Sequence, residues 1–277
     1  MRFWLGASFS DTGEFLELAR AAERCGIDTL TLSDHIFFAD FETPYPYGKM
    51  RWTAQTHWPD PWITIGAMAA VTTTLRFAPN VYVAPARDLF TVAKQVSTAA
   101  ALSGGRVSFG VGVGWCREEF EATGQDFHTR GRRLDEMIPA LRELWTGRTV
   151  EHHGRFYDFG PLSMSPPGGD IPVYVGGDSD AALRRAARIG DGWVGNRIYT
   201  EERLDEVLLR LNGFLKEYGR GPIEVVAPLA VLPDAATYRK FADKGVTATF
   251  TAPWWIWKDM SKIAAMERFH EEIIANM

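Results

Sequence analysis

The strongest constraint on the fold is an alternation, repeated eight times, of short apolar runs with longer segments of helical periodicity. Glycine, proline or aspartate bounds the apolar runs, which is typical of successive strand–helix units that build a parallel sheet. We expect strands at 3–9, 29–34, 75–83, 106–113, 171–176, 192–196, 223–232 and 246–252. We expect helices at 13–25, 60–73, 88–102, 130–146, 179–189, 200–218, 234–244 and 259–275.

The ends of the expected helices carry chemical signals. Asp60 and Pro61 supply an N-cap side chain and a proline at the first helical position, where its missing N–H costs nothing. Glycines that can adopt positive φ follow helices at Gly26, Gly147, Gly190 and Gly245. The chain has 277 residues, and about 250 is usual for one α/β barrel. It therefore predicts a single domain over 1–277, a (β/α)8 TIM barrel.

Two long insertions interrupt the rhythm. Segment 36–59, rich in aromatic residues and proline, follows the second strand and is expected on the face where the strands end. Segment 147–170 precedes the fifth strand and is expected at the opposite end, as a small hairpin around Gly154 before a Pro-Pro-Gly-Gly loop. Long loops in compact domains are usually functional or mobile.

Composition excludes several classes of function. Net charge is −5 with the basic residues scattered, whereas a nucleic-acid surface needs a basic patch. Cys25 and Cys116 form no CxxC pair, and the histidines lack the spacing of a zinc site, so we expect neither a disulfide nor a metal. No apolar run reaches the roughly 18 residues of a membrane span, and no signal peptide is evident. We expect a cytoplasmic protein.

The first candidate for chemistry is Ser33-Asp34-His35, at the end of the second strand. Catalytic groups of an α/β barrel come from the carboxyl ends of the strands and the loops after them. A histidine there can exchange a proton near neutral pH, and the adjacent carboxylate of Asp34 can orient it. The alternative is that Asp34 caps a turn while His35 packs under the aromatic segment. The strand-end position favours a function.

Two further strand ends stand out. Asn80 interrupts the apolar third strand, and a polar side chain facing the lumen needs a partner, either a ligand or, as the sequence alone favours, neighbouring backbone. The fourth strand ends in GVGVGW at 110–115, where glycines permit close approach to the backbone and Trp115 can wall a planar ring. The run is not a GxGxxG fingerprint, and its glycines can equally relieve crowding in the barrel.

The fifth strand ends in VGGDS at 175–179, at the start of a helix. Amides at a helix N-terminus lack intrahelical partners and favour negative charge, so this turn indicates a phosphate site. The alternative is a simple N-cap by Asp178 or Ser179, and the charge of Asp178 opposes an anion beside it. The run WWIW at 254–257 follows the last strand and either lines an apolar pocket or is buried at a dimer interface.

Taken together, the chain resembles the luciferase-like monooxygenase superfamily over nearly its whole length. The most specific stretches are SDH at 33–35, GRVSFGVGVGW at 105–115, IPVYVGG at 171–177 and AARIGDGW at 186–193. This superfamily includes bacterial luciferase, FMN-dependent monooxygenases, and F420-dependent dehydrogenases and reductases.

The resemblance implies roles for individual residues. His35 matches a catalytic histidine that exchanges a proton during hydride transfer. The turn at 176–179 would hold the cofactor phosphate, the turn at 112–115 its ribityl chain or ring, and Asn80-Val81, often joined by a cis peptide bond in relatives, would lie behind the ring. The implied cofactor-binding residues are Asp34, His35, Asn80, Val81, Gly112, Gly114, Trp115, Gly176, Gly177, Asp178 and Ser179.

The function implied by the resemblance is F420-dependent hydride transfer to or from a small organic substrate. Luciferase places a basic residue for the FMN phosphate in its fourth strand turn, whereas this chain has Val113 among glycines, which favours F420 over FMN. One alternative is an FMNH2-dependent monooxygenase using O2, sheltered by segment 36–59 and served by a separate reductase. Another is a non-catalytic flavin-binding barrel. The resemblance also implies a homodimer.

Overall fold

The computed structural model describes residues 1–38, 41–50 and 52–277. Its barrel strands are β1 (Arg2–Gly6), β2 (Thr29–Leu32), β3 (Arg76–Pro79), β4 (Phe109–Val111), β7 (Val173–Gly176), β8 (Gly192–Val194), β9 (Glu224–Val226) and β10 (Ala248–Thr251). All eight predicted strands are present. Their regular ladders are shorter than predicted, because the predicted ranges include residues of the adjoining turns, such as Ser33 and Asp34 after β2.

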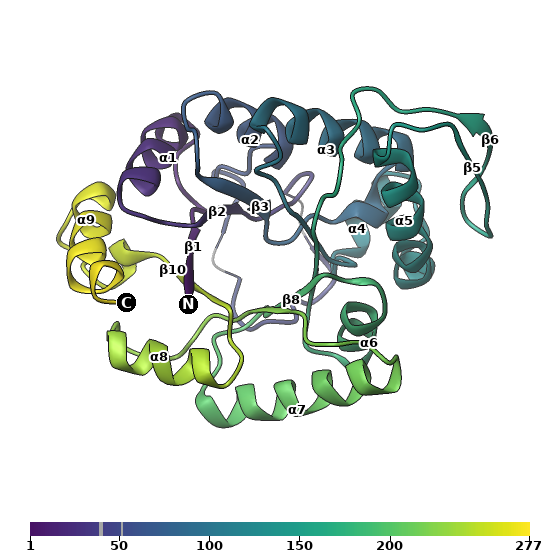
Figure 1. The fold of residues 1–277 in the computed structure, drawn as a ribbon. Coiled ribbons are helices and arrows are strands. Elements are labelled where there is room, and N and C mark those ends of the chain that lie inside the picture. Colours follow the sequence, from purple (N-terminus) through teal and green to yellow (C-terminus); the bar gives the residue numbers. More distant parts are fainter. Residues whose placement is uncertain (39–40, 51) are drawn as a thin grey trace.

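The eight strands are parallel and form one sheet in the order β3-β2-β1-β10-β9-β8-β7-β4. The two ends of this order, β3 and β4, meet through the single parallel bridges Phe77–Val107 and Tyr82–Val111. These bridges close the sheet on itself, and helices surround it (Figure 1). The predicted (β/α)8 TIM barrel is confirmed.

In the described part of the chain, eight helices match the predicted segments, and a ninth was not predicted. The matching helices are α1 (Phe15–Arg24), α2 (Pro61–Ala69), α3 (Leu89–Ser103), α5 (Arg130–Trp145), α6 (Asp180–Ile189), α7 (Glu201–Glu217), α8 (Ala235–Asp243) and α9 (Lys262–Glu272). The additional helix is α4 (Arg117–Ala122). Short 3-10 helices occupy Thr12–Glu14, Ala84–Ala86, Phe127–Thr129, Pro253–Trp255 and Ile274–Asn276.

Most of the predicted helix boundaries hold. The carboxylate of Asp60 accepts the amides of Trp62 and Ile63 at 2.9 and 3.0 Å. Gly26, Gly147 and Gly245 have φ values of 69°, 70° and 97°. The prediction of positive φ at Gly190 is wrong, since its backbone is extended with φ −87°. A glycine fits there for another reason: a Cβ atom would lie 2.9 Å from the carbonyl oxygen of Ala186.

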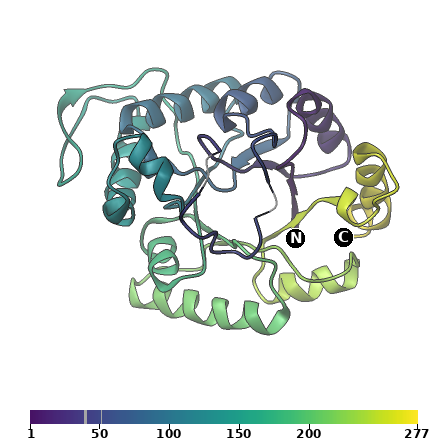
Figure 2. The same cartoon turned by 180° about the vertical axis from the view of Figure 1, so that it is seen from behind.

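The two insertions differ in their placement. The described part of segment 36–59 crosses one end of the barrel (Figure 2), and its residues 39–40 and 51 lie outside the described residues. The second insertion contains the hairpin of β5 (Val150–His153) and β6 (Asp158–Leu162), which projects beside α5 (Figure 1). Only the first insertion contributes to the large pocket of the barrel.

Large side chains fill the lumen. The rings of Trp4 on β1 and Tyr174 on β7 lie 5.1 Å apart, and Phe250 on β10 packs 5.7 Å from Trp4. Because β1 and β7 are not neighbours in the sheet, the contact between Trp4 and Tyr174 crosses the barrel interior. The lumen is therefore a packed core. Among the described residues, no helix is both long and apolar enough to cross a bilayer.

Candidate functional site

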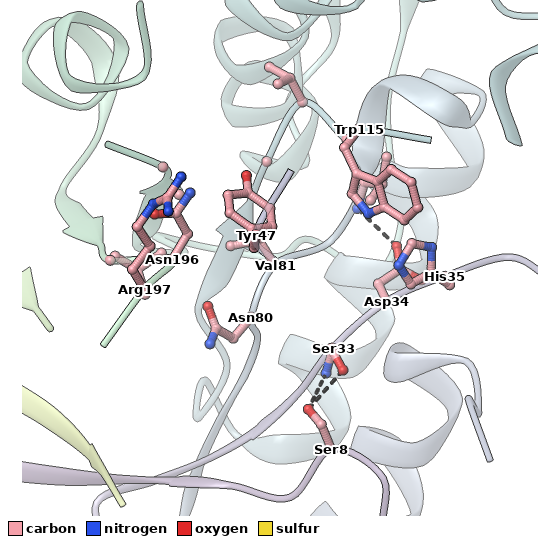
Figure 3. A pocket seen from close by; sticks show the side chains of 18 of the residues that line it. Ser8, Ser33, Asp34, His35, Tyr47, Asn80, Val81, Trp115, Asn196 and Arg197 are labelled. Atoms are coloured by element: carbon pink, nitrogen blue, oxygen red, sulfur yellow. Dashed lines mark hydrogen bonds between the residues drawn. The ribbon is translucent and has the colours of Figure 1, made fainter. Parts of the chain in front are cut away.

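A pocket of about 490 Å3 opens where the barrel strands end (Figure 3). Its walls are the turns after the strands, together with the aromatic residues of segment 36–59. All of the residues predicted for the site line this one pocket: Asp34, His35, Asn80, Val81, Gly112, Gly114, Trp115, Gly176, Gly177, Asp178 and Ser179. The structure thus brings the predicted residues together, while their roles toward a cofactor stay predictions.

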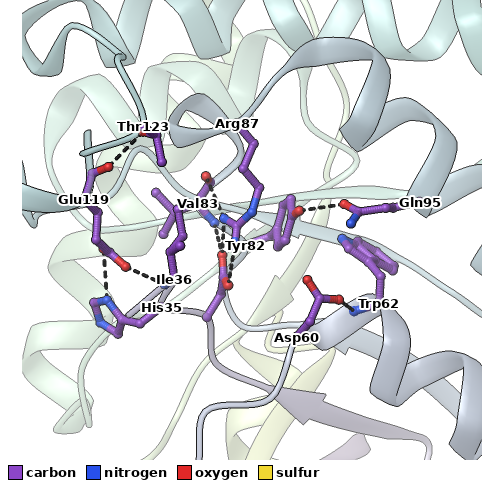
Figure 4. A network of polar contacts seen from close by, with 11 residues as sticks. His35, Ile36, Asp60, Trp62, Tyr82, Val83, Arg87, Gln95, Glu119 and Thr123 are labelled. Carbon is purple, nitrogen blue, oxygen red and sulfur yellow. Dashed lines mark hydrogen bonds and ion pairs between the residues drawn. The ribbon is translucent and has the colours of Figure 1, made fainter. Parts of the chain in front are cut away.

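The imidazole of His35 is held by a buried carboxylate. Nδ1 of His35 lies 3.0 Å from Oε2 of Glu119, and Oε1 of Glu119 accepts the amide of Ile36 at 2.6 Å (Figure 4). The side chains of His35 and Glu119 are only 11% and 2% exposed. When Nδ1 donates its hydrogen to this carboxylate, Nε2 remains for exchange with a guest.

Asp34, which we expected to orient His35, has a different partner. Its carboxylate receives two hydrogen bonds from the guanidinium of Arg87, at 2.7 and 2.8 Å, and one from the amide of Val83 at 2.8 Å. Desolvation raises the pKa of the Asp34 carboxyl, while the charge of Arg87 acts in the opposite direction. The expectation that Asp34 orients His35 is therefore wrong. A buried carboxylate needs a cation, and here it ties the loop after β3 to the end of β2.

Glycines at the ends of β4 and β7 make room for the valines that follow β3. A Cβ atom on Gly112 would lie 2.5 Å from Cγ2 of Val81, and one on Gly176 would lie 2.7 Å from its Cγ1. Gly114, at φ 78°, would meet Val83 at 2.5 Å. The atoms next to these glycines are thus side chains of the protein, Val81 and Val83. This agrees with the alternative explanation, that the glycines relieve crowding in the barrel.

The Asn80–Val81 peptide bond, whose isomer the sequence left open, is cis. The main-chain amide of Asn80 donates to the carbonyl of Leu32 at 2.6 Å. Its side chain points into the pocket (Figure 3) and makes no hydrogen bond within the described part of the chain. The expected backbone partner is therefore not found, and the carboxamide is available to a guest.

The turn after β7 has the features of an anion site. Ser179 caps α6 by accepting the amide of Ala182 at 3.3 Å, and Gly177 has φ 111°. Across the described residues, the amides of Asp178 and Ser179 make no hydrogen bond inside the chain. Unpaired amides at a helix N-terminus attract a phosphate.

Asp178 sits at this turn with cations around it. Its Oδ2 atom lies 3.3 Å from Nε of Arg197 and 3.8 Å from Nη2 of Arg203. These arginines compensate the charge that we expected to oppose an anion. Oδ2 is nevertheless buried and receives no well-oriented hydrogen bond from the described residues. A buried acceptor of this kind fits a hydroxyl group of a bound molecule.

Aromatic rings form the wall around His35. The ring centroids of Trp58, Trp52 and Trp115 lie 4.8, 5.6 and 5.7 Å from that of the imidazole. Tyr45 packs against both Trp52 and Trp115, at 4.8 and 5.2 Å. This wall makes the His35 side of the pocket apolar.

Some residues of the site were not predicted. No sequence pattern identified Glu119, Arg87 or Arg197, because each of them pairs with a residue that lies far away along the chain. Glu119 also lies on the short helix α4, which the periodicity did not reveal.

The run 254–257 does not line the pocket. Trp254 and Trp257 pack against the hydrophobic core, and Trp255 is 61% exposed. Their place in the pocket wall is thus excluded, and a dimer interface stays a prediction.

The sequence comparisons agree with this geometry. The family model described as luciferase-like monooxygenase matches residues 4–240. An uncharacterised protein of Mycobacterium tuberculosis is 37% identical, and the match covers 100% of both chains. The F420-dependent glucose-6-phosphate dehydrogenase of Mycobacterium avium is 32% identical over 70% of this chain and 57% of its own length.

Solved structures share the fold. An F420-dependent secondary alcohol dehydrogenase, in complex with an F420-acetone adduct, superposes with a TM-score of 0.76 at 16% identity, covering 100% and 99% of the two chains. The oxygenating constituent of 3,6-diketocamphane monooxygenase from Pseudomonas putida, in complex with FMN, gives a TM-score of 0.64 at 17% identity, covering 88% and 72%. Relatives and neighbours thus use F420 or FMN. The chain belongs to the luciferase-like monooxygenase family of oxidoreductases.

Proposed function

We propose that this protein catalyses F420-dependent hydride transfer to or from a small organic substrate, with His35 as the residue that exchanges the proton. The observation that carries the proposal is the pairing of His35 with Glu119, which fixes one ring nitrogen and leaves the other for exchange. The F420-dependent relative from Mycobacterium avium supports the choice of cofactor.

The pocket fits a phosphorylated cofactor with a hydroxylated chain. The unpaired amides of Asp178 and Ser179 would receive the phosphate. Oδ2 of Asp178 is a buried acceptor for a hydroxyl group, and the carboxamide of Asn80 would bond a polar edge of the ring. Val81 would support the ring face from below, since it projects into the pocket between Gly112 and Gly176.

The bound F420 supplies a ring that accepts or donates a hydride. The protein provides the proton exchange and the orientation. With Nδ1 held by Glu119, Nε2 of His35 takes a proton from a substrate hydroxyl or returns it to a carbonyl oxygen. The negative charge of Glu119 stabilises the imidazolium formed on the way. The three tryptophans around His35 exclude water from the reacting atoms.

The direct test is a titration of the purified protein with F420 and, separately, with FMN, followed by absorbance. We expect saturable binding of F420 and weaker binding of FMN. The variant His35→Ala should keep cofactor affinity and lose turnover. Tight binding of FMN without binding of F420 would overturn the choice of cofactor. Unchanged turnover in His35→Ala would overturn the role assigned to His35, and cofactor binding by the native protein without turnover of any tested substrate would favour a non-catalytic flavin-binding barrel.

A second candidate function is an FMNH2-dependent monooxygenase that uses O2. The observation in its favour is the aromatic cover of the pocket, which would keep water from a reduced flavin. This function requires a separate reductase, which we propose as a partner only in this case. Oxygenated product formed with FMN, a flavin reductase and O2, but not with F420, would support it.

A further inference from the structure

We infer that Arg197 binds the phosphate group of the cofactor and makes this site select a phosphorylated ring compound over the same compound without its phosphate. This inference rests on the proposed function, because it takes the turn after β7 as the phosphate site. It assigns a role in ligand binding to a side chain that the sequence pattern did not identify.

The topology of the barrel places Arg197 beside this turn. Strands β7 and β8 pair in parallel, with Gly176 opposite Val194, and the amide of Gly177 donates to the carbonyl of Val194 at 3.2 Å. Arg197 follows shortly after Val194, in the loop at the same end of the barrel. Its side chain lines the pocket and lies across it from His35 (Figure 3). The guanidinium is therefore on the side where the phosphate would bind.

The peptide groups of the turn are oriented through their carbonyl oxygens. The carbonyl of Gly177 accepts the indole N–H of Trp193 at 2.6 Å, and that of Asp178 accepts Nη2 of Arg210 at 3.1 Å. In a trans peptide group, the N–H points away from the C=O of the same group. The amides of Asp178 and Ser179 therefore point away from these two side chains. Two neighbouring donors are thus left for an anion.

The guanidinium of Arg197 has donors left for the same anion. Its contact with Asp178 runs through Nε, 3.3 Å from Oδ2, and its Cζ atom lies 5.4 Å from the ring centroid of Tyr47. Within the described residues, neither of its terminal amino groups donates a hydrogen bond. A guanidinium can present two parallel N–H groups to the oxygens of one phosphate, which makes a strong, charge-assisted contact.

A second arginine faces the same carboxylate but differs in its surroundings. Arg203 lies 3.8 Å from Oδ2 of Asp178 and donates a hydrogen bond to Glu206 at 2.8 Å. Arg203 is not part of the pocket wall, whereas Arg197 is. Both arginines therefore compensate the charge of Asp178, and of the two, Arg197 is the one that can also touch a bound molecule.

The test measures how much the phosphate adds to binding, with two pairs of ligands. FMN is compared with riboflavin, and F420 with its deazariboflavin, which lacks the phosphate and the tail beyond it. Titrations followed by fluorescence give the ratio of affinities within each pair. In Arg197→Leu we expect this ratio to fall by about tenfold or more, because the phosphorylated ligand loses a charge-assisted contact. The affinity for the phosphate-free ligand should stay within about twofold, which also reports that the variant is folded.

Two further variants distinguish direct contact with the phosphate from compensation of Asp178. Arg203→Leu removes the same charge beside this carboxylate from outside the pocket, and should leave the ratio within about twofold. In the background Asp178→Asn there is no carboxylate to compensate. Adding Arg197→Leu to this background should still lower the ratio by about tenfold.

The outcomes separate this inference from the proposed function. An unchanged ratio in Arg197→Leu would overturn the inference even if F420 binds as proposed. Equal losses in Arg197→Leu and Arg203→Leu would also overturn it, and so would a loss that disappears in the Asp178→Asn background, because Arg197 would then only neutralise the carboxylate. If the protein binds FMN but not F420, the proposed cofactor is wrong, and the ratio of FMN to riboflavin still decides the role of Arg197.

Discussion

A Cβ atom on Gly112, after β4, would lie 2.5 Å from Cγ2 of Val81, after β3. A residue with a side chain therefore does not fit at position 112 unless Val81 moves. A Cβ atom on a second glycine, Gly176, would lie 2.7 Å from Cγ1, the other methyl group of the same valine. The side chain of Val81 thus lies against the ends of both β4 and β7. This contact fixes the pocket floor on which the proposed cofactor ring would rest.

Gly112→Ala should therefore destabilise the fold and weaken cofactor binding. Overpacking of a fitted site typically costs about 1–3 kcal/mol, which lowers the melting temperature measurably. The double variant Gly112→Ala with Val81→Ala removes the clashing methyl group and should recover part of the loss. As a control, Gly213→Ala lies in α7 with nothing within 4 Å and should be neutral or stabilising. A melting temperature unchanged in Gly112→Ala would contradict this account.

The variant Glu119→Gln should distinguish two effects of Glu119, the positioning of the His35 ring and the stabilisation of a positive charge on it. The amide keeps a hydrogen-bond acceptor for Nδ1 but no longer stabilises the imidazolium. We expect kcat to fall by about 10- to 100-fold, and the pH profile of kcat to shift to lower pH, with cofactor affinity little changed. Glu121→Gln, at an exposed position of the same helix, is the control. A lower kcat without any shift of the pH profile would assign Glu119 a purely structural role.

The fold and the location of the site were predictable because their signals are local. Periodicity distinguishes strands from helices within single segments, and the topology of a (β/α)8 barrel then gathers the strand ends on one face. The glycine turns at 110–115 and 175–179 follow directly from that rule, and both line the pocket.

The partners of the site residues were not predictable in the same way. Asp34 precedes His35, which suggested that they interact, yet neighbouring side chains of an extended chain point to opposite sides. Asp34 therefore faces Arg87, and His35 faces Glu119, a residue 84 positions away. A helix of six residues, such as α4, is too short to show the period that would have placed Glu119.

Asp34→Asn should destabilise the protein strongly. It leaves the guanidinium of Arg87, whose side chain is 15% exposed, without its carboxylate, and breaking a buried ion pair from one side costs about 3–5 kcal/mol. The free energy of unfolding, measured with denaturant, tests this value. The double variant Asp34→Leu with Arg87→Met removes both charges and should cost less than the single change. If the double variant is the less stable of the two, the ion pair is not the origin of the effect.

The carboxyl group of Glu23 should make the free energy of unfolding depend on pH in the acid range. Burial acts to raise the pKa of its carboxyl, but amide hydrogen bonds from Thr73, Thr74 and Leu75 prevail and lower the pKa from 4.5 to about 2. Because this pKa is lower in the folded chain than in the unfolded chain, the stabilisation is complete above pH 4.5 and is lost as the pH falls toward 2.

The test of this linkage compares Glu23→Gln with the native protein over the same pH range. Glu23 is only partly buried, so screening by solvent reduces its effect, and we expect the variant to be less stable by about 1 kcal/mol at neutral pH. The difference in unfolding free energy should shrink below pH 4.5 and vanish near 2. Glu17→Gln, an exposed position on the same helix, should show no such trend. If the difference stays constant with pH, the ionised carboxylate of Glu23 is not what stabilises the contact between α1 and the segment before β3.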